Sequence, residues 1–309
     1  MKRDFLSILD LNEKEILYIL KKAKNLKKNK KFEKILKGKI LALIFEKPSL
    51  RTRVSFETGI KKLGGDVVYL SSSDIKMGER EDVKDIAKNL ERWVDGIIAR
   101  VFSHESLKIL SENTKIPVIN ALSDLEHPCQ ILADLQTIEE YSGDYKGPLA
   151  FIGDGNNVCH SLILAFSILG GKINVANPKN YEPKEEILKK AFEISKKTGA
   201  EIKITNDPYE AVKNVKFIYT DVWASMGQEH EREERKKIFK DYQVNMNLIK
   251  AAERKVYFMH CLPAHRGEEV TDEVLDSDFS LVYEQAENRM WAQIALFYHI
   301  YSRRKNERV

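Results

Sequence analysis

Short apolar runs recur along the chain, and each is followed by a stretch whose apolar residues have helical spacing. Runs of about four to eight apolar residues bounded by turn residues are typical of buried strands. Strands that alternate with helices predict parallel sheets with right-handed crossovers, so the fold class is predicted to be α/β. The strands are expected at residues 40–45, 66–70, 96–101, 117–121, 149–152, 172–176, 201–204, 215–220, 255–259 and 281–283.

The alternation is interrupted once, at the turn cluster GDYKGP of residues 143–148, and then starts again. A chain of 309 residues is long enough for about two domains. We therefore expect two doubly wound parallel-sheet domains that are joined by connector helices. Because open parallel sheets bind ligands beyond the carboxyl ends of their strands, the active site is expected in the interdomain cleft.

The stretch FEKPSLRTRVSFE, residues 45–57, lies where the first predicted strand gives way to a helix. Ser49 is a good helix N-cap, and the first turn of a helix leaves backbone N–H groups that favour an anion. Arg51, Thr52 and Arg53 add guanidinium and hydroxyl donors that fit a phosphate. The stretch therefore predicts a phosphate cradle without a glycine-rich loop, although a solvated helix start with surface arginines has the same pattern.

Other polar clusters follow the predicted strands, where ligands of parallel sheets bind. They are Arg100 and residues 127–130, 153–157, 221–227 and 260–267. Arg100 could equally form a structural ion pair, and His127 could act as a cap before Pro128. Residues 71–82 contain few apolar side chains and are expected to form a mobile loop.

Several function classes are disfavoured by their missing motifs. The GDGNN segment lacks the third glycine of a dinucleotide fingerprint, and the next strand ends without an acid for a ribose. Three adjacent His/Cys sets occur without CxxC or HxxxH spacing, so no metal is expected. Neither GxSxG nor a P-loop is present, which disfavours serine hydrolases and NTPases. We therefore expect neither a cofactor nor a metal.

The composition is that of a globular protein without an extreme charge. Charged residues make up 32% of the chain, and the formal net charge is +4. The lysine-rich stretch 21–39 lacks interleaved aromatics, and the run HEREERKK of residues 230–237 is expected to be a solvated helix face, so no nucleic-acid partner is predicted. No apolar run approaches the ~20 residues of a membrane span. Three cysteines and no signal-peptide pattern indicate a reducing, cytoplasmic location.

The two halves of the chain offer different chemistry. The first half carries arginines, hydroxyls, an imidazole and an amide, which suit an anionic group with a carbonyl to be polarised. The second half carries Asn157, Asp221, Ser225 and the Cys261 thiol, which suit a zwitterionic partner that bears an amine. Two substrates that meet between two domains would explain both sets.

At these residues the chain resembles the aspartate/ornithine carbamoyltransferase family over essentially its whole length, and within it the ornithine branch. The resemblance rests on SLRTRVSFE, HPCQ, DVWASMGQE and HCLPAHRG. It implies a carbamoyl-phosphate-binding domain at residues 1–142 and an ornithine-binding domain at residues 143–285. Residues 286–309 would form a C-terminal helix that packs back on the first domain.

The resemblance also implies the residues that bind carbamoyl phosphate. Those expected to bind it are Ser49, Leu50, Arg51, Thr52, Lys76, Arg100, His127, Gln130 and Arg289. Arg100 and His127, with Thr52, would polarise the carbonyl, and Gln130 would hold the carbamoyl amide. The family commonly has Thr where Leu50 stands, and Gln or His where Lys76 stands.

For ornithine, the resemblance implies contacts to the α-amino and α-carboxylate groups from Asn157, Asp221, Ser225 and Met226. Cys261 and the Leu262 carbonyl would orient the δ-amine. The residues expected to act in catalysis are Arg51, Arg100, His127 and Cys261. Whether Cys261 acts as a base or only positions the amine stays open.

The implied reaction is direct attack of the neutral δ-amine on the carbamoyl carbon, which gives citrulline and phosphate in arginine biosynthesis or in the reverse, catabolic direction. The family also implies a homotrimer or a multiple of trimers, in which the loop that carries Lys76 reaches a neighbouring subunit's site. Alternatives are a carbamoyltransferase for another amine, such as putrescine or an acylated ornithine, and a catalytically silent binding subunit. A nucleotide-binding oxidoreductase is the most distant alternative.

Overall fold

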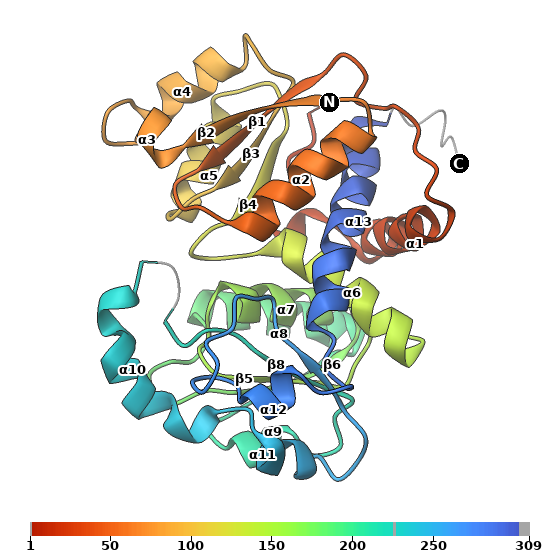
Figure 1. The fold of residues 1–309 in the computed structure, drawn as a ribbon, viewed down its shortest axis with the longest axis vertical. Helices are drawn as coiled ribbons and strands as arrows, with labels where there is room; N and C mark the ends of the chain where they lie inside the picture. The colour runs from red at the N-terminus through yellow and green to blue at the C-terminus, as the bar shows by residue number, and fades with distance from the viewer. Residues whose placement is uncertain (1, 225–226, 303–309) are drawn as a thin grey trace. The chain divides into compact units, whose positions relative to one another are not determined.

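The computed structural model describes residues 2–224 and 227–302 (Figure 1). Ser225 and Met226, which were predicted to bind ornithine, lie outside the described residues. The chain divides into two compact units. Unit 1 comprises Met1–Ala133 and Asn288–Val309, and unit 2 comprises Asp134–Glu287.

Unit 1 is built on a parallel sheet with the strand order β2-β1-β3-β4. The strands are β1 (Ile40–Phe45), β2 (Asp66–Ser71), β3 (Gly96–Arg100) and β4 (Val118–Leu122). In the register, Phe45 pairs with Arg100, so the carboxyl ends of the two central strands lie level. This alignment brings the residues that follow β1 close to Arg100.

Helices cover both faces of this sheet. They are α1 (Glu13–Asn29), α2 (Leu50–Lys62), α3 (Ser72–Ile75), α4 (Val83–Leu90), α5 (His104–Glu112), the first part of α6 (Pro128–Ser142) and most of α13 (Val282–Tyr301). The alternate residues Ala42 and Ile44 of β1 pack in a buried cluster with α4 and α5. Helices α2 and α13 lie side by side (Figure 1), and Phe56 meets Phe297 edge-on at 6.1 Å.

Unit 2 repeats this architecture with the strand order β7-β6-β5-β8-β9, again all parallel. The strands are β5 (Leu149–Ile152), β6 (Lys172–Ala176), β7 (Glu201–Thr205), β8 (Phe217–Thr220) and β9 (Tyr257–Met259). The helices are α7 (Asn157–Leu169), α8 (Glu185–Thr198), α9 (Pro208–Ala211), α10 (Arg232–Phe239), α11 (Met246–Lys250) and α12 (Asp272–Leu275), with the end of α6 and the start of α13. The prediction of an α/β fold with two parallel sheets is confirmed.

Two local predictions were wrong. Residues 281–283 do not form a strand, because α13 already begins at Val282 and only an isolated bridge joins Ser280 to Phe258. The segment 71–82 is not an irregular loop throughout, since it contains the helical turn α3 and a bridge from Met77 to Glu81. A run of three residues, such as 281–283, is too short for its apolar pattern to distinguish a strand from the first turn of a buried helix.

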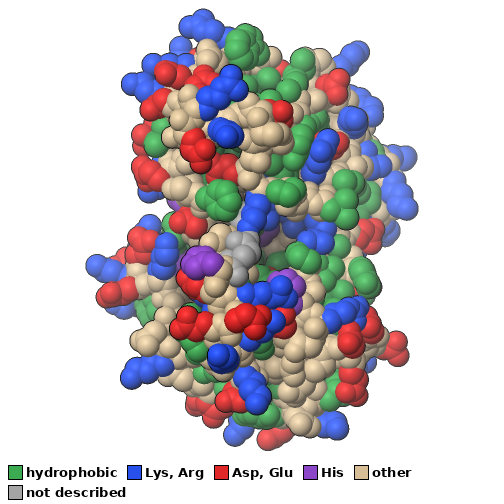
Figure 2. All heavy atoms as spheres, turned by 60° about the vertical axis from the view of Figure 1, so that its left-hand side comes forward, with side chains coloured by type: hydrophobic (Ala, Val, Ile, Leu, Met, Phe, Trp, Pro, Cys, Tyr) green, Lys and Arg blue, Asp and Glu red, His purple; other side chains and the backbone are tan. Residues whose placement is uncertain are grey.

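The surface agrees with the small net charge. On the face that Figure 2 shows, acidic and basic side chains are intermixed, and hydrophobic ones are scattered between them. Among the described residues, no helix is both long and apolar enough to cross a membrane.

Candidate active site

The first cluster of site residues begins where β1 ends and α2 starts. Ser49 is the N-cap of α2, and its hydroxyl accepts the backbone N–H of Thr52 at 3.3 Å. Leu50 is the first residue of the helix, and 75% of its surface is exposed. The start of a helix favours an anion, because its first N–H groups have no carbonyl acceptor one turn earlier.

Arg289 of α13 joins this helix start to α6. One terminal nitrogen, Nη2, donates to the Thr52 hydroxyl at 2.7 Å, and the other, Nη1, donates to Oε1 of Gln130 at 2.8 Å. Arg100, at the end of β3, places its Nη1 3.5 Å from the same Thr52 hydroxyl. Thr52, Gln130 and Arg289 are all buried. Four predicted residues from four elements therefore converge.

His127 directly precedes α6 and is buried in the same region. Burial lowers its pKa well below the ordinary value, and the positive charges of Arg289, Arg100 and Arg51 lower it further. The imidazole is therefore neutral at physiological pH, and it can donate one N–H without bringing a charge. Three guanidinium groups around a neutral donor are suited to an anionic substrate with a carbonyl oxygen.

Lys76 is exposed at the end of α3, with a φ of 26°. Among the described residues, no hydrogen bond or ion pair joins its side chain to the Thr52 cluster. Its predicted contact with carbamoyl phosphate remains a prediction, as do the roles of Ser49, Leu50 and Arg51.

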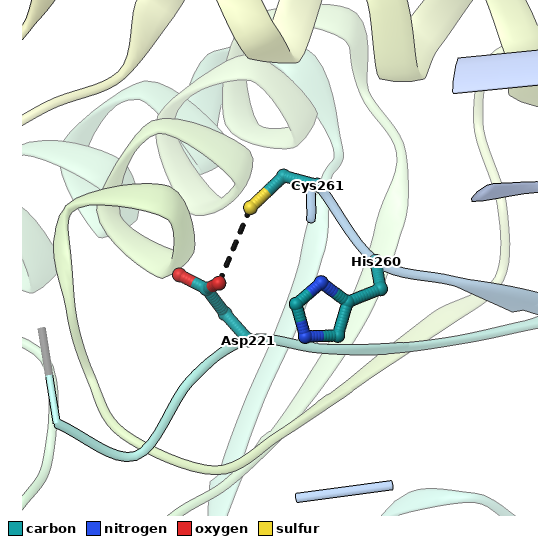
Figure 3. Close-up of side chains that lie close together, drawn as sticks. All are labelled: Asp221, His260 and Cys261. Atoms are coloured by element: carbon teal, nitrogen blue, oxygen red, sulfur yellow. Dashed lines mark hydrogen bonds between the residues drawn. The ribbon is translucent and has the colours of Figure 1, made fainter. Parts of the chain in front are cut away.

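The second cluster lies at the carboxyl ends of β5, β8 and β9 in unit 2. Asp221 follows β8, is 7% exposed, and accepts a hydrogen bond from Asn156 Nδ2 at 2.8 Å. The Cys261 thiol, just after β9, donates to the other oxygen of Asp221 at 3.2 Å (Figure 3). The structure thus brings the predicted residues Asp221 and Cys261 together.

The amide beside Asp221 comes from Asn156, which lies in the predicted cluster 153–157, whereas the role in ornithine binding was assigned to its neighbour Asn157. Asn156 is the N-cap of α7, and its Oδ1 accepts the backbone N–H groups of Val158 and Cys159 at 3.0 and 3.1 Å. Its Nδ2 is left to reach Asp221. Asn157, the predicted ornithine ligand, is the half-buried first residue of α7. The choice between two adjacent asparagines depends on the capping geometry, which a GNN sequence does not reveal.

His260 fixes the backbone around Cys261. Its Nδ1 accepts the N–H of Leu262 at 2.8 Å, so the proton is assigned to Nε2, which lies 3.1 Å from Oε1 of Glu269. Both side chains are fully buried. Leu262 has a φ of 57°, a left-handed conformation that costs about 1–2 kcal/mol for a residue with a Cβ. Backbone strain of this kind is typical of sites where a carbonyl must point in one direction.

The ligand atoms of Asp221, His260 and Cys261 lie within 4.8 Å of one another, which suggests a metal centre at first sight. However, the first ring nitrogen of His260 accepts from Leu262 and the second faces Glu269. The imidazole therefore has no lone pair to offer. These contacts suit the positioning of a thiol better than the ligation of an ion.

Arg235 in the charged run 230–237 is not solvated, contrary to the sequence prediction. It is 6% exposed, donates to the Trp223 carbonyl at 2.8 Å and pairs with Asp154 at 3.1 Å. Burial raises the pKa of Asp154 to about 6 even though the Arg235 charge opposes the change. The pair ties the loop after β5 to the loop after β8. In the sequence, the burial of Arg235 is indicated only by its position four residues before the apolar Phe239, which places both on one face of α10.

Comparisons with known proteins identify the family of both halves of the chain. Residues 3–140 match the family model described as "Aspartate/ornithine carbamoyltransferase, carbamoyl-P binding domain", and residues 146–300 match "Aspartate/ornithine carbamoyltransferase, Asp/Orn binding domain". An ornithine carbamoyltransferase of Bacillus thuringiensis subsp. konkukian is 52% identical over 97% of this chain and 94% of its own length.

Solved structures give the same result. The ornithine carbamoyltransferase of Pyrococcus furiosus has a TM-score of 0.93 and 49% identity, over 97% of each chain. The anabolic ornithine carbamoyltransferase of Campylobacter jejuni has a TM-score of 0.92 and 40% identity, over 97% of this chain and 99% of its own.

Proposed function

Because the chain belongs to the aspartate/ornithine carbamoyltransferase family, we propose that it transfers the carbamoyl group of carbamoyl phosphate to the δ-amine of L-ornithine. The products are L-citrulline and phosphate. The observation that carries this proposal is the convergence of Arg289 and Arg100 on the buried Thr52 hydroxyl at a helix start, with Gln130 bonded to the same Arg289. It supplies cations, N–H groups and an amide acceptor at one place.

Carbamoyl phosphate fits the first cluster by charge and by hydrogen-bonding pattern. The phosphate accepts from the N–H groups at the start of α2 and from Arg51, as anions at helix starts do. Arg100, the Thr52 hydroxyl and the neutral His127 donate to the carbonyl oxygen. Gln130, whose Oε1 already faces Arg289, accepts the carbamoyl N–H. These roles follow the sequence prediction, and residues 1–142 form the domain for this substrate.

Ornithine fits the second cluster, in the domain of residues 143–285. The Asp221 carboxylate attracts the α-ammonium group, and the Asn157 side chain, with Ser225 and Met226, completes the hold on the amino-acid end. Cys261 and the Leu262 carbonyl accept from the δ-amine. The φ of 57° at Leu262 and the His260–Glu269 pair support a fixed direction for that carbonyl.

The mechanism is a direct transfer. The lone pair of the neutral δ-amine forms a C–N bond to the carbamoyl carbon, the carbonyl electrons move to its oxygen, and a tetrahedral oxyanion results. The oxyanion collapses, the C–O bond to phosphate breaks, and the departing phosphate takes up the proton that the amine loses. The protein supplies proximity and preorganised donors that face the developing charge. The rate should rise with pH until the attacking amine is neutral.

The test is citrulline formation from carbamoyl phosphate with ornithine, putrescine or aspartate as the amine, in parallel. We expect citrulline from ornithine, and a loss of about 100- to 1,000-fold in turnover for Arg51→Ala, because one donor to the charged group is removed. Lys61→Ala, at the exposed far end of α2, is the matched control and should keep full activity.

The other results of this assay would each change the assignment. Turnover of putrescine instead of ornithine would keep the phosphate cradle but reject the role of Asp221. Absence of turnover with every amine, from folded protein, would favour a silent binding subunit.

For assembly, we propose a homotrimer or a multiple of trimers. Strand β2 is an edge strand of its sheet, and the nearby Leu50, Val54 and Val68 are 75%, 50% and 44% exposed. Exposed apolar side chains beside an open strand edge suit an interface between subunits. Lys76 follows this strand and would reach a neighbouring site.

Sedimentation equilibrium should give about three times the chain mass of 35.7 kDa, or a multiple of that value. Val54→Glu would place a carboxylate on this surface and should release smaller species. A monomer at micromolar wild-type protein would refute the trimer.

A further inference from the structure

A buried carboxylate in unit 2 has no role in the contacts described so far. Asp134, on α6, is completely buried. Its Oδ2 accepts the Tyr219 hydroxyl at 3.0 Å, and its Oδ1 accepts Nε2 of Gln285 at 2.9 Å. A buried carboxylate is costly unless hydrogen bonds compensate its charge, and these two bonds compensate that of Asp134.

The Gln285 arm leads to the thiol. Oε1 of Gln285 accepts the backbone N–H of His260 at 2.9 Å. A carboxylate can only accept hydrogen bonds, so Asp134 forces Gln285 to present its NH₂ group on that side. The amide carbonyl is then left for the N–H of His260, the residue before Cys261. The charge of Asp134 thus determines which way the Gln285 amide points.

The Tyr219 arm leads to the carboxylate of the site. Tyr219 lies on β8, two residues before Asp221, and its ring stacks on Phe151 at 5.7 Å. Burial raises the pKa of Tyr219 well above its ordinary value, and the charges of Asp134, Cys261 and Asp221 add to the shift. Its hydroxyl therefore stays protonated and can donate to Asp134 at any working pH. Asp134 is thus linked by hydrogen bonds to the ends of both β9, which precedes Cys261, and β8, which precedes Asp221.

We propose that Asp134 is a positioning residue of the ornithine half-site, which fixes Cys261 through Gln285 and the His260 backbone, and Asp221 through Tyr219. The inference rests on the proposed function for the identity of the amine. It adds three residues, Asp134, Gln285 and Tyr219, that touch no substrate but set where the δ-amine and the α-ammonium group are held.

Gln285→Leu is the main test, because leucine is similar in size but offers neither the donor nor the acceptor. We expect kcat/KM for ornithine to fall about 100-fold, since small misplacements at a reacting centre cost this much. KM for carbamoyl phosphate should change less than about twofold, because the residues proposed to bind that substrate do not include Gln285, Asp134 or Tyr219.

Gln285→Glu is the conservative variant. Two buried carboxyl groups in hydrogen-bond contact readily share one proton. The shared proton would replace the bond between residue 285 and Asp134, and the other oxygen of the introduced carboxyl group can still accept the His260 N–H. This variant should recover at least about tenfold of the loss. Tyr219→Phe should raise KM for ornithine, whereas Tyr242→Phe, which removes a buried hydroxyl bonded to the Asn177 and Asn206 carbonyls, should not.

A second readout does not depend on turnover. Cys129 and Cys159 are buried and Cys261 is partly exposed, so iodoacetamide should alkylate Cys261 first, and Cys261→Ser identifies its signal. In Gln285→Leu we expect alkylation about threefold faster, because a released thiol is more exposed. Wild-type kinetics and alkylation in Gln285→Leu would overturn the proposal. If the wild type makes no citrulline, the proposed function fails, and the alkylation rates alone decide the positioning role.

Discussion

Replacing His127 with phenylalanine is expected to lower kcat for citrulline formation by about 100- to 1,000-fold. In the proposed mechanism the neutral imidazole donates an N–H to the carbonyl oxygen of carbamoyl phosphate, where negative charge develops as the amine attacks. Phenylalanine fills similar space but cannot donate. Steady-state kinetics at saturating ornithine and carbamoyl phosphate measure the effect.

The environment of His127 explains why a neutral donor is used. Burial and the charges of Arg289, Arg100 and Arg51 all disfavour the imidazolium form. A charged imidazole would add a fourth cation to a desolvated pocket, whereas the neutral ring adds a dipole without that cost. His127→Gln keeps an amide N–H of comparable reach, and it should recover part of the rate. Equal kcat values for the wild type and His127→Phe would remove His127 from the mechanism.

The burial of His127 also makes the free energy of unfolding depend on pH. The pKa of His127 is lowered in the folded chain and returns to its ordinary value of about 6.5 on unfolding. Below that value the unfolded chain binds more protons, so the free energy of unfolding falls as the pH falls through 6.5 towards the folded pKa. His127→Phe should lose this part of the acid dependence in urea titrations at pH 5 and pH 7.

The sequence predicted best what depends on local chemistry. Ser49 follows a proline at the end of an apolar strand, and a hydroxyl at that place caps a helix wherever the rest of the chain lies. The alternation of strands and helices likewise predicted two parallel sheets, because each crossover is a local unit. The contact between Arg289 and Thr52 could not be predicted from local patterns, since 237 positions separate the two residues. Only the resemblance to the family identified Arg289.

Other contacts were missed because they depend on which face of an element is buried. Arg235 lies in a run of charges that looks solvated, yet one helical face of α10 packs inward and takes Arg235 with it. Asp134 stands in the buried part of α6 without any motif around it, and its partners come from β8 and α13. Pairs of this kind are set by the tertiary fold, so a single sequence carries no pattern for them.

The clusters of unit 1 and unit 2 follow one design. In each, a capping side chain accepts a backbone N–H in the first turn of a helix that starts at the carboxyl edge of a sheet: Ser49 for α2 and Asn156 for α7. A buried group from a distant segment then bonds to this helix start, Arg289 to Thr52 in the first and Asp221 to Asn156 in the second. Parallel strands bring such loops to one edge, and the long-range bond selects one arrangement of them.

Asp221→Asn is the second change with a large expected effect, and it should lower kcat/KM for ornithine by about 30- to 5,000-fold. The estimate is the loss of about 2–5 kcal/mol that follows when one partner of a desolvated charge pair is neutralised. Asparagine can still accept from Nδ2 of Asn156, so the loop should keep its shape while the α-ammonium group of ornithine loses its counter-ion. Kinetics with ornithine varied at saturating carbamoyl phosphate give the value.

Two further measurements show whether the lost charge is the cause. Asp241→Asn makes the same chemical change at an exposed position of unit 2, and it should leave kcat/KM for ornithine unchanged. KM for carbamoyl phosphate should not change in either variant, because Asp221 contacts Asn156 and Cys261 in unit 2, whereas the residues assigned to that substrate belong to unit 1. An Asp221→Asn variant with the wild-type KM for ornithine would show that the α-ammonium group binds elsewhere, and the buried carboxylate would then serve only to hold Asn156 and the Cys261 thiol in place.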